Sequence, residues 1–541
     1  MKTLSPQRFS TLYSDTKEKA ERDFLLKERC RYDLELFARV FFPHYCTRPF
    51  SIFHLEIFED FKTQERGDRS ATAAPRGNAK TTFRALIKAI HDVCYGLERF
   101  IVIISNTADL SNQKLKDIRD EVLTNDRLAE FYHLRFPSKK PGESQFLILS
   151  EAGETYFMAF GRGAQVRGVR YKEARPSKVI CDDVEHSDEV YNEAIRKKTL
   201  DWFREDVSKI GDERTNIDFV GTVLHRDSLL QSLMNNPRYR SKKYKSVISW
   251  ADRQDLWKEW ERVYMDLNNL GRREEARLFF EARKDEMLKG TQVLWPEKED
   301  YYFLMEEMIE IGRRSFFKEK QNEPLGADEK VFERIWWYRE ESGGARIEET
   351  GELVPWEMLK NQAYGALDPS AGQKKAKKGR LGDYACIVAG FSHPNGRIFV
   401  HRDWTKRVPP TKQMEMVFEM HEEFKFQKFG VETNLYRNLM LPNMIEERKR
   451  REKERKSLIH LPFYEIEQIE NKEKRITALE PKVTHAWLIL NRALSEPARQ
   501  MLEEFPHSDH DDFCDALDML YGLVHNRYKA SAESIDAVMG R

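Results

Sequence analysis

Short apolar runs that end in polar residues limit most strongly what this chain can fold into. The clearest are Arg99–Asn106 and Lys178–Glu185, the second of which ends in acids. Runs of this length are typical of strands buried in a parallel sheet, where ligands gather at the carboxyl ends of the strands. Helical patterns separate these runs, so we expect an open α/β sheet over about residues 70–230.

A loop of small residues precedes an apolar helical pattern at Ala74–Thr82. Such a loop can wrap backbone N–H groups around phosphates, with Lys80 reaching the outer phosphates and Thr81 holding Mg²⁺. The match to G-x-x-x-x-G-K-[ST] is imperfect, because Ala74 and Ala79 stand where the two glycines belong. Taken alone, the segment fits a surface turn that caps a helix as well as it fits a nucleotide loop.

Acids follow the second buried run, as Mg²⁺–nucleotide chemistry requires. One of Asp182 and Asp183 could serve the water shell of the metal while the other polarises the attacking water. The alternative for this pair is a strand-terminating turn or a helix N-cap. A further strand at 216–224 contains Gly221-Thr222, where a hydroxyl could sense the terminal phosphate, although a plain turn also fits.

Composition sets broad limits on the class of protein. A chain of 541 residues is too long for one core, so two large domains are expected. Lys+Arg and Asp+Glu both total 91, which leaves room for a local basic face that binds nucleic acid. Six scattered cysteines argue against a zinc site or a disulfide framework. Neither a membrane-spanning run nor a signal-peptide core is found, so we expect a cytoplasmic protein.

The second half of the chain begins with a different strand pattern. Ala363–Ser370 is a strand that carries Asp368 near its end, and two more strands follow at 383–390 and 397–400 with a tight turn between them. This pattern predicts an antiparallel meander. After a helix at 411–426, a short strand delivers Glu432.

The last helical pattern of the chain is rich in acids. Asp512 and Asp515 stand three residues apart and project from one face of the helix. They could merely complement the helix dipole. Together with Asp368 and Glu432, however, they form the arrangement that brings separated carboxylates around two divalent cations, which can activate water and stabilise the departing oxygen of a phosphodiester.

Together these motifs resemble the large terminase subunit of tailed double-stranded DNA bacteriophages, over roughly residues 41–526. The resemblance implies an α/β fold with a P-loop (ASCE/RecA-like) ATPase domain built on a parallel sheet, followed by an RNase H/RuvC-like nuclease domain built on a mixed sheet. The expected segments are an N-terminal helical arm (1–40), the ATPase domain with a helical subdomain (41–335), a linker (336–360), the nuclease domain (361–526) and a C-terminal tail (527–541).

The resemblance also implies roles for residues of the first half. Asp182 matches the magnesium acid and Asp183 the catalytic acid, with Glu185 as a competitor because the sequence departs from the commoner Asp-Glu. Thr222 matches the coupling motif, and Mg²⁺ would be held by Thr81 and Asp182. The arginine that neutralises charge is left open among Arg162, Arg167 and Arg170. The residues expected to contact ATP in the loop are Arg76, Gly77, Asn78, Ala79, Lys80, Thr81 and Thr82, with Arg76 also assigned a catalytic role at the phosphates.

In the second half, the resemblance assigns Asp368, Glu432, Asp512 and Asp515 as catalytic metal ligands for Mg²⁺, or for Mn²⁺ in vitro. Asp383 and Asp511 are weaker candidates, and the main ligand among Asp511, Asp512 and Asp515 is left open. The basic run Lys472–Ile476 is expected to approach DNA.

The function that the resemblance implies is ATP-driven translocation of double-stranded DNA into a procapsid, with endonucleolytic cutting of concatemeric DNA. The implied partners are the portal protein, a small terminase subunit and further copies of this chain in a ring, expected to be a pentamer, with a monomer in solution left open. The implied location is the host cytoplasm, with transient docking on the portal and no membrane. The mode of cutting, at fixed sites or by head filling, is left open.

Two other functions share some of these features. A helicase-nuclease of DNA repair or recombination would have the same acids and P-loop, but it should also show a second RecA-like strand series, which is not found between residues 231 and 360. A non-enzymatic DNA-binding scaffold with a degenerate nucleotide site would respond to neither ATP nor Mg²⁺.

Overall fold

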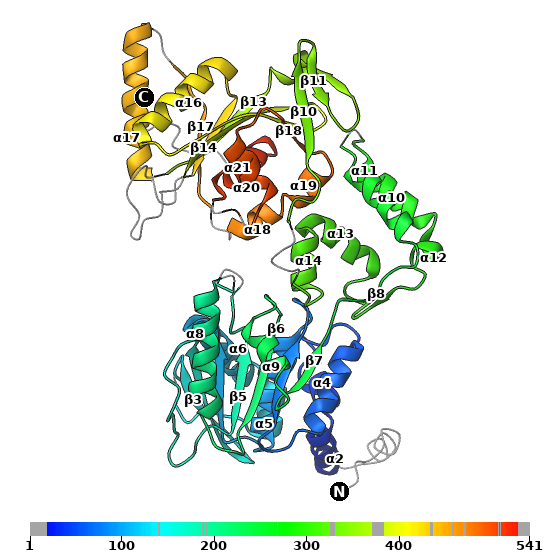
Figure 1. Cartoon of the computed structure of the whole chain (residues 1–541). Coiled ribbons are helices and arrows are strands. Elements are labelled where there is room, and N and C mark those ends of the chain that lie inside the picture. Colours follow the sequence, from blue (N-terminus) through cyan, green and yellow to red (C-terminus); the bar gives the residue numbers. More distant parts are fainter. Residues whose placement is uncertain are drawn as a thin grey trace. The chain divides into compact units, whose positions relative to one another are not determined.

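The chain is divided into two compact units (Figure 1). Unit 1 contains Met1–Ala251, Gly290–Glu306 and Phe316–Leu325, and unit 2 contains Asp252–Lys289, Glu307–Ser315 and Gly326–Arg541. The structure is a computed structural model, which describes residues 19–138, 141–186, 189–190, 192–267, 269–324, 330–370, 384–432, 437–456, 459–468, 472–506, 508 and 510–528.

Unit 1 is built on a seven-stranded sheet of order β3-β4-β2-β5-β6-β1-β7. All neighbouring strands are parallel except β3, which runs antiparallel to β4. Since β6 lies between β1 and β5, the carboxyl ends of these three strands come side by side. The strands are β1 (Arg69–Ala73), β2 (Phe100–Ser105), β3 (Gln145–Ser150), β4 (Gly153–Gly161), β5 (Lys178–Asp182), β6 (Asn216–Gly221) and β7 (Arg240–Lys243).

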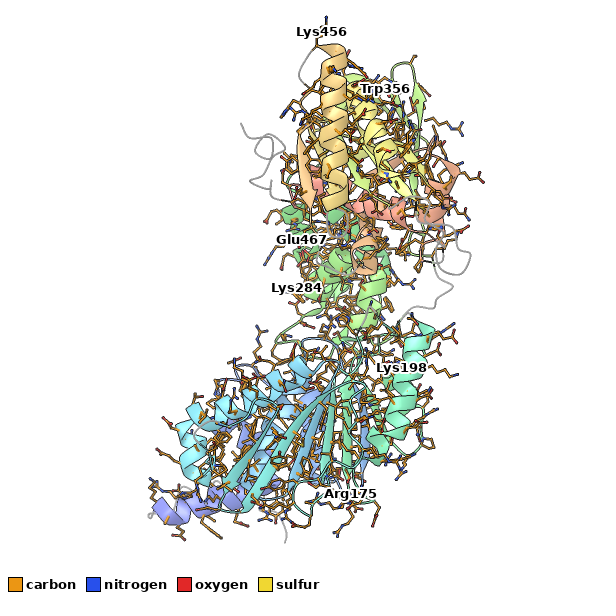
Figure 2. The ribbon with its side chains drawn as sticks, turned by 90° about the vertical axis from the view of Figure 1, so that its left-hand side faces the viewer. Arg175, Lys198, Lys284, Trp356, Lys456 and Glu467 are labelled. Carbon is orange, nitrogen blue, oxygen red and sulfur yellow. The ribbon has the colours of Figure 1, made fainter. Side chains whose placement is uncertain are left out.

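Helices cover both faces of this sheet, because side chains of a strand alternate between its two faces. Ile101 and Ile103 of β2 pack in one core, and Val102 and Ile104 pack in the other. The first core includes residues of α2 (Lys19–Tyr32), α3 (Leu34–Phe41), α4 (Ile52–Lys62), η1 (Thr82–Ile87), α5 (Lys88–Cys94), α6 (Ala108–Thr124) and α7 (Asp126–Tyr132). The second includes residues of α8 (Glu193–Glu205), η2 (Val207–Lys209) and α9 (Leu229–Met234). Figure 2 marks α8 by Lys198.

Unit 2 is built on a nine-stranded mixed sheet of order β12-β11-β10-β18-β15-β14-β13-β16-β17. Strands β13, β14 and β15 form the expected antiparallel meander, and β16 pairs with β13 in parallel. The strands are β10 (Trp336–Glu341), β11 (Gly344–Ile347), β12 (Leu353–Pro355), β13 (Ala363–Asp368), β14 (Ala385–Ser392), β15 (Ile398–Lys406), β16 (Lys428–Glu432), β17 (Phe463–Ile466) and β18 (Leu488–Asn491). The predicted α/β fold class, with a parallel-sheet domain followed by a mixed-sheet domain, is confirmed.

The helices of unit 2 also lie on both faces of its sheet. One core combines alternate strand residues with residues of α15 (Trp356–Leu359), α16 (Pro410–Phe424) and α17 (Arg437–Arg455). In Figure 2, the label Lys456 marks the C-terminal end of α17. The other core contains residues of α18 (Lys472–Thr477), α19 (Glu480–Thr484), α20 (Glu496–Glu503) and α21 (Asp512–Val524). Among the described residues, no helix is long and apolar enough to cross a bilayer.

Two segments differ from the expected organisation. Residues 336–360 were expected to be a linker, but they form β10, β11, β12 and α15, because Trp337 and Tyr338 bury on opposite faces of the sheet. Gly343 and Gly344 lie where β10 turns into β11, and Gly351 lies between β11 and β12. Residues of the expected N-terminal arm are core residues as well, since Leu34 and Phe37 pack in unit 1.

The expected helical subdomain is shared between the two units. Helices α10 (Gln254–Met265), α11 (Arg272–Glu281) and α12 (Lys284–Met287) belong to unit 2, where the Trp487 Nε1–H donates to the Met265 carbonyl at 2.7 Å. The remaining elements of this stretch are β8 (Val247–Ser249), β9 (Gln292–Val293), α13 (Tyr301–Ile311) and α14 (Arg313–Glu319).

Gly365 of β13 allows a close approach that no larger residue would permit. A Cβ there would lie 2.6 Å from Phe429 Cδ2, and the Phe429 ring is fully buried. We expect Gly365→Ala to lower the free energy of unfolding by about 1–3 kcal/mol through overpacking, measured by denaturant unfolding. Gly343→Ala is the control, because its Cβ would meet its nearest atom at 3.7 Å. Equal stability of the two variants would contradict this packing.

Candidate active sites

The loop after β1 has two residues in the left-handed region of backbone conformation although it is poor in glycine. Gly77 has φ +87°, and Ala79, at the position of the missing glycine, has φ +55°. A residue with a Cβ pays about 1–2 kcal/mol for this left-handed conformation, so the surrounding structure must hold it there. Both side-chain amide atoms of buried Asn78 lack hydrogen-bond partners among the described residues, as expected of a loop shaped for a ligand.

Lys80 contacts two other residues predicted for this site, Thr222 and Asp183. Its buried Nζ donates to the Thr222 hydroxyl at 2.7 Å and to the Ala74 carbonyl at 3.2 Å, and it lies 3.7 Å from Asp183 Oδ1. Burial lowers the pKa of Lys80, while the nearby Asp183 opposes that shift. Thr222 comes directly after β6, so the strand order explains why it meets the loop that follows β1.

The two acids after β5 have different surroundings. Asp182 is fully buried; Lys114 of α6 donates to its Oδ2, and its Oδ1 has no hydrogen-bond partner among the described residues. Burial, reinforced by Asp183, raises the pKa of Asp182. Asp183 is exposed, with φ +47°, a strained backbone of the kind that collects at functional sites. A buried carboxylate oxygen without a partner at the end of β5 fits the oxygen chemistry of Mg²⁺.

Glu185, the competitor of Asp183, is already engaged elsewhere. Its two carboxylate oxygens accept hydrogen bonds from Leu229 N at 2.7 Å and from Leu230 N at 3.2 Å, at the start of α9. Burial raises its pKa. Asp183, by contrast, lies beside Lys80 and is the better placed of the two acids to face the phosphates.

A cavity of about 500 Å³ opens beside this loop. Tyr45, Phe50 and Trp295 supply aromatic walls, and loop residues that include Lys80 and Thr81 supply the opposite side. Sequence analysis assigned neither Trp295 nor Lys298 to this site, because both are far from the loop along the chain. Lys298 donates to the Gly77 carbonyl and helps to hold the loop. A volume with aromatic walls next to a phosphate loop suits a nucleotide.

Of the four arginines expected near the phosphates, two form ion pairs with glutamates in this structure and two are exposed. Arg76 is 57% exposed at its side chain, pairs with Glu319 Oε1 at 3.1 Å and lines the cavity. Arg162 pairs with Glu189, whereas Arg167 and Arg170 are exposed. None of the last three is singled out as the charge-neutralising arginine.

His54 of α4 is a brace for the loop that the sequence did not reveal. Its Nδ1 accepts a hydrogen bond from Ser51 N at 3.1 Å, so in the neutral ring the proton is on Nε2, which donates to the Asn78 carbonyl at 3.1 Å. Burial lowers the pKa of His54 to about 4, which keeps the ring neutral at pH 7. The bonded carbonyl is adjacent to Ala79, so this bond supports the strained residue.

In the second unit, the strand alternation places the predicted acids on one face. Tyr364 and Ala366 of β13 pack in the core that includes α21, and Asp368 follows them with the same parity. Phe429 and Val431 of β16 pack in the opposite core, so Glu432 lies on the same face as Asp368. Because Leu367 pairs with Val431 in the parallel ladder, these two acids end neighbouring strands.

Helix α21 completes this acid cluster. Asp512 and Asp515 lie in its first turn and are buried. The negative charges of Asp515, Asp512 and Glu432 add to burial and raise the pKa of Asp368 well above its usual value, while Lys472 lowers it. Burial likewise raises the pKa of Asp515 to about 6. The structure thus brings together all four predicted acids.

Carboxylates that repel one another in this way have the donor chemistry that Mg²⁺ and Mn²⁺ prefer. As the side chains stand, no group of three possible ligands among the described residues is close enough to hold a metal ion. Cations of α18 contact the acids instead. Lys472 and Arg475 of the run Lys472–Ile476 form ion pairs with acids of α21, and the expected approach of this run to DNA stays a prediction. Asp383 and residues 529–541 lie outside the described residues.

Stability should depend on pH through His54. In the unfolded chain His54 takes up a proton near pH 6.5 but in the folded chain only near pH 4, so stability is lost as pH falls through this window. The expected loss from this group is about 3 kcal/mol. Urea unfolding at about pH 7 and about pH 4 checks it, since His54→Gln should lose less stability on acidification than the wild type. Equal losses would contradict the brace.

Comparison of the sequence with protein-family models and with curated proteins found no match. Among solved structures, the chain is similar to the large terminase of a thermophilic bacteriophage, at 8% identity and a TM-score of 0.44, over 88% of this chain and 100% of that one. It is also similar to the bacteriophage HK97 large terminase, at 11% identity and a TM-score of 0.31, over 91% and 99% of the two chains. A third similar structure is the yeast mitochondrial Holliday junction resolvase Ydc2, at 10% identity and a TM-score of 0.22, over 31% of this chain and 81% of that one.

Proposed function

We propose that this chain is the large terminase subunit of a tailed double-stranded DNA bacteriophage, with an ATPase in unit 1 and an endonuclease in unit 2. The observation that carries the proposal is the presence in one chain of two built sites on separate sheets. One is the Lys80, Thr222 and Asp183 cluster beside an aromatic-walled cavity, and the other is the acid cluster around Asp368.

In the proposed ATPase, Lys80 would bind the outer phosphates and Asp183 would orient and polarise the attacking water. Mg²⁺, held by Thr81 and Asp182, would neutralise charge on the phosphate oxygens when bound. Lys80 would leave the Thr222 hydroxyl for a phosphate and return after phosphate release. Thr222 would thereby sense the nucleotide state at the end of β6. Arg76 would reach the phosphates only by leaving Glu319.

In the proposed nuclease, Asp368, Glu432, Asp512 and Asp515 would hold two divalent cations. Such cations supply an activated water and stabilise the departing oxygen of a phosphodiester. The acids themselves fix where the scissile phosphate can bind, at the carboxyl ends of β13 and β16 beside the first turn of α21. Contacts to DNA would be made mostly to phosphates, so binding should be sensitive to salt and largely indifferent to sequence.

The proposed partners are double-stranded DNA, a portal protein, a small terminase subunit and further copies of this chain in a ring, with action at the procapsid in the host cytoplasm. The helicase-nuclease alternative is less well supported, because the second large sheet is a mixed one with an antiparallel meander rather than a second parallel nucleotide-binding sheet.

An ATPase assay should distinguish the role of Asp183 from that of Glu185. We expect Asp183→Asn to lower kcat by about 100-fold or more, the typical loss for a group that activates the nucleophile. Glu185→Gln should instead lower the free energy of unfolding by about 1–2 kcal/mol through the weakened cap of α9, with kcat within a few-fold of wild type. The reverse pattern would assign the catalytic role to Glu185.

The two activities should be separable by crossed variants. Lys80→Ala should abolish ATP hydrolysis and leave Mn²⁺-dependent plasmid nicking, because its contacts lie within unit 1. Asp368→Ala should abolish nicking and leave ATP hydrolysis. Steady-state phosphate release and gel analysis of plasmid DNA measure these outcomes. If both variants matched the wild type in both assays, the proposed function would be wrong.

A further inference from the structure

Lys472, the first residue of α18, lies inside the acid cluster of unit 2. Its Nζ donates to Asp511 Oδ1 at 2.6 Å and to Asp515 Oδ2. One turn later, Arg475 Nη2 donates to Asp515 Oδ1 at 3.0 Å, and Nη1 donates to Asp518 Oδ2 at 2.9 Å. Both carboxylate oxygens of Asp515 are therefore bound by cations of the same short helix.

The two cations of α18 differ in how easily they can leave. The Lys472 side chain is 41% exposed, whereas that of Arg475 is 9% exposed and is tied to both Asp515 and Asp518. A lysine ammonium sits on a flexible stem and is readily hydrated, while a guanidinium with two partners is fixed by its planar fork. Lys472 can thus move into solvent while Arg475 keeps Asp515 in place.

The charge of Lys472 balances a cluster that would otherwise repel itself. Asp515, Asp511 and Asp368 raise the pKa of Lys472 despite its partial burial, and Lys472 in turn opposes the upward shift of the Asp368 pKa. A divalent cation would serve the same purpose with twice the charge. Ammonium and metal ion therefore compete for the same carboxylate oxygens.

We propose that Lys472 is the resident counter-ion of the nuclease site, and that divalent cations bind by displacing its ammonium from Asp511 and Asp515. Arg475 is the positioning residue that holds Asp515 during the exchange. The inference rests on the proposed nuclease function and deepens it. Divalent cations then have to compete with the Lys472 ammonium, so the wild-type site binds them more weakly than its four acids would by themselves.

The test is calorimetric titration of the full chain with Mn²⁺ in the absence of DNA and nucleotide. Lys472→Met keeps the length of the side chain and removes its charge. It should bind Mn²⁺ at least ten-fold more tightly than the wild type. Its melting temperature should be lower than that of the wild type in EDTA, and it should rise more when Mn²⁺ is added. Asp182→Asn in every protein used removes the carboxylate that would otherwise hold Mn²⁺ at the nucleotide site.

Lys412→Met is the matched control, because Lys412 forms an exposed pair with Glu415 on α16 at 2.5 Å, outside the acid cluster. It should leave Mn²⁺ affinity and melting temperature unchanged. Lys472→Arg keeps the positive charge and covers the case in which the methionine variant does not fold; it should bind Mn²⁺ no more tightly than the wild type and melt close to it in EDTA.

The inference is overturned if Mn²⁺ binds the wild type and folded Lys472→Met with equal affinity, or binds the variant more weakly. It is also overturned if Lys472→Arg binds Mn²⁺ more tightly than the wild type. Asp368→Asn separates this from failure of the proposed function. If Mn²⁺ binds and Asp368→Asn weakens it, the nuclease site stands whatever Lys472 does. If Asp368→Asn has no effect, the metal-dependent nuclease is wrong, and the role of Lys472 falls with it.

Discussion

A carboxylate removed from water needs a positive partner, and both candidate sites of this chain depend on that requirement. Asp182 and Asp368 are buried at the ends of central strands, where burial raises the pKa of each. In each case a lysine from a helix packed on the sheet brings the compensating charge, Lys114 of α6 for Asp182 and Lys472 of α18 for the acid cluster. Each helix therefore has to lie where its lysine can balance the charge of the buried acid.

In the loop that follows β1, contacts from outside the loop compensate for an unfavourable backbone conformation. Ala79 takes a backbone conformation that glycine would adopt without strain. His54 and Lys298, which are far from the loop in sequence, each donate to a loop carbonyl next to the strained region. A loop held from outside in this way does not need the usual glycines, and that explains how so imperfect a motif can still have the expected shape.

Local sequence patterns were sufficient to predict much of the fold. The apolar runs of β2, β5 and β6 and the acid-ended strand β13 could be predicted because each has its signal within a few residues. The four acids of unit 2 could also be predicted, since strand ends and helix turns place them. What could not be predicted depends on distant contacts. The cap that Glu185 forms on α9 and the inward turn of Lys472 have no local signature.

The misjudged segments have the same cause. The glycine-rich stretch before β13 has the composition of a linker, but Trp337 and Tyr338 give β10 two apolar faces, and β18, from much later in the chain, pairs with it. Similarly, α10 and α11 carry helical patterns that do not indicate which unit they join. Contacts such as the one between Trp487 and Met265 decide this.

The acid cluster of unit 2 also determines how early during synthesis its acids can come together. Asp368 lies on the central sheet of unit 2, and its partners Asp512 and Asp515 lie on α21, the last helix that the structure describes. Domains generally fold from the N-terminus as synthesis proceeds. A nascent chain can therefore assemble the loop that follows β1 long before these carboxylates meet, so the proposed nuclease would become able to cut DNA only after α21 had been made.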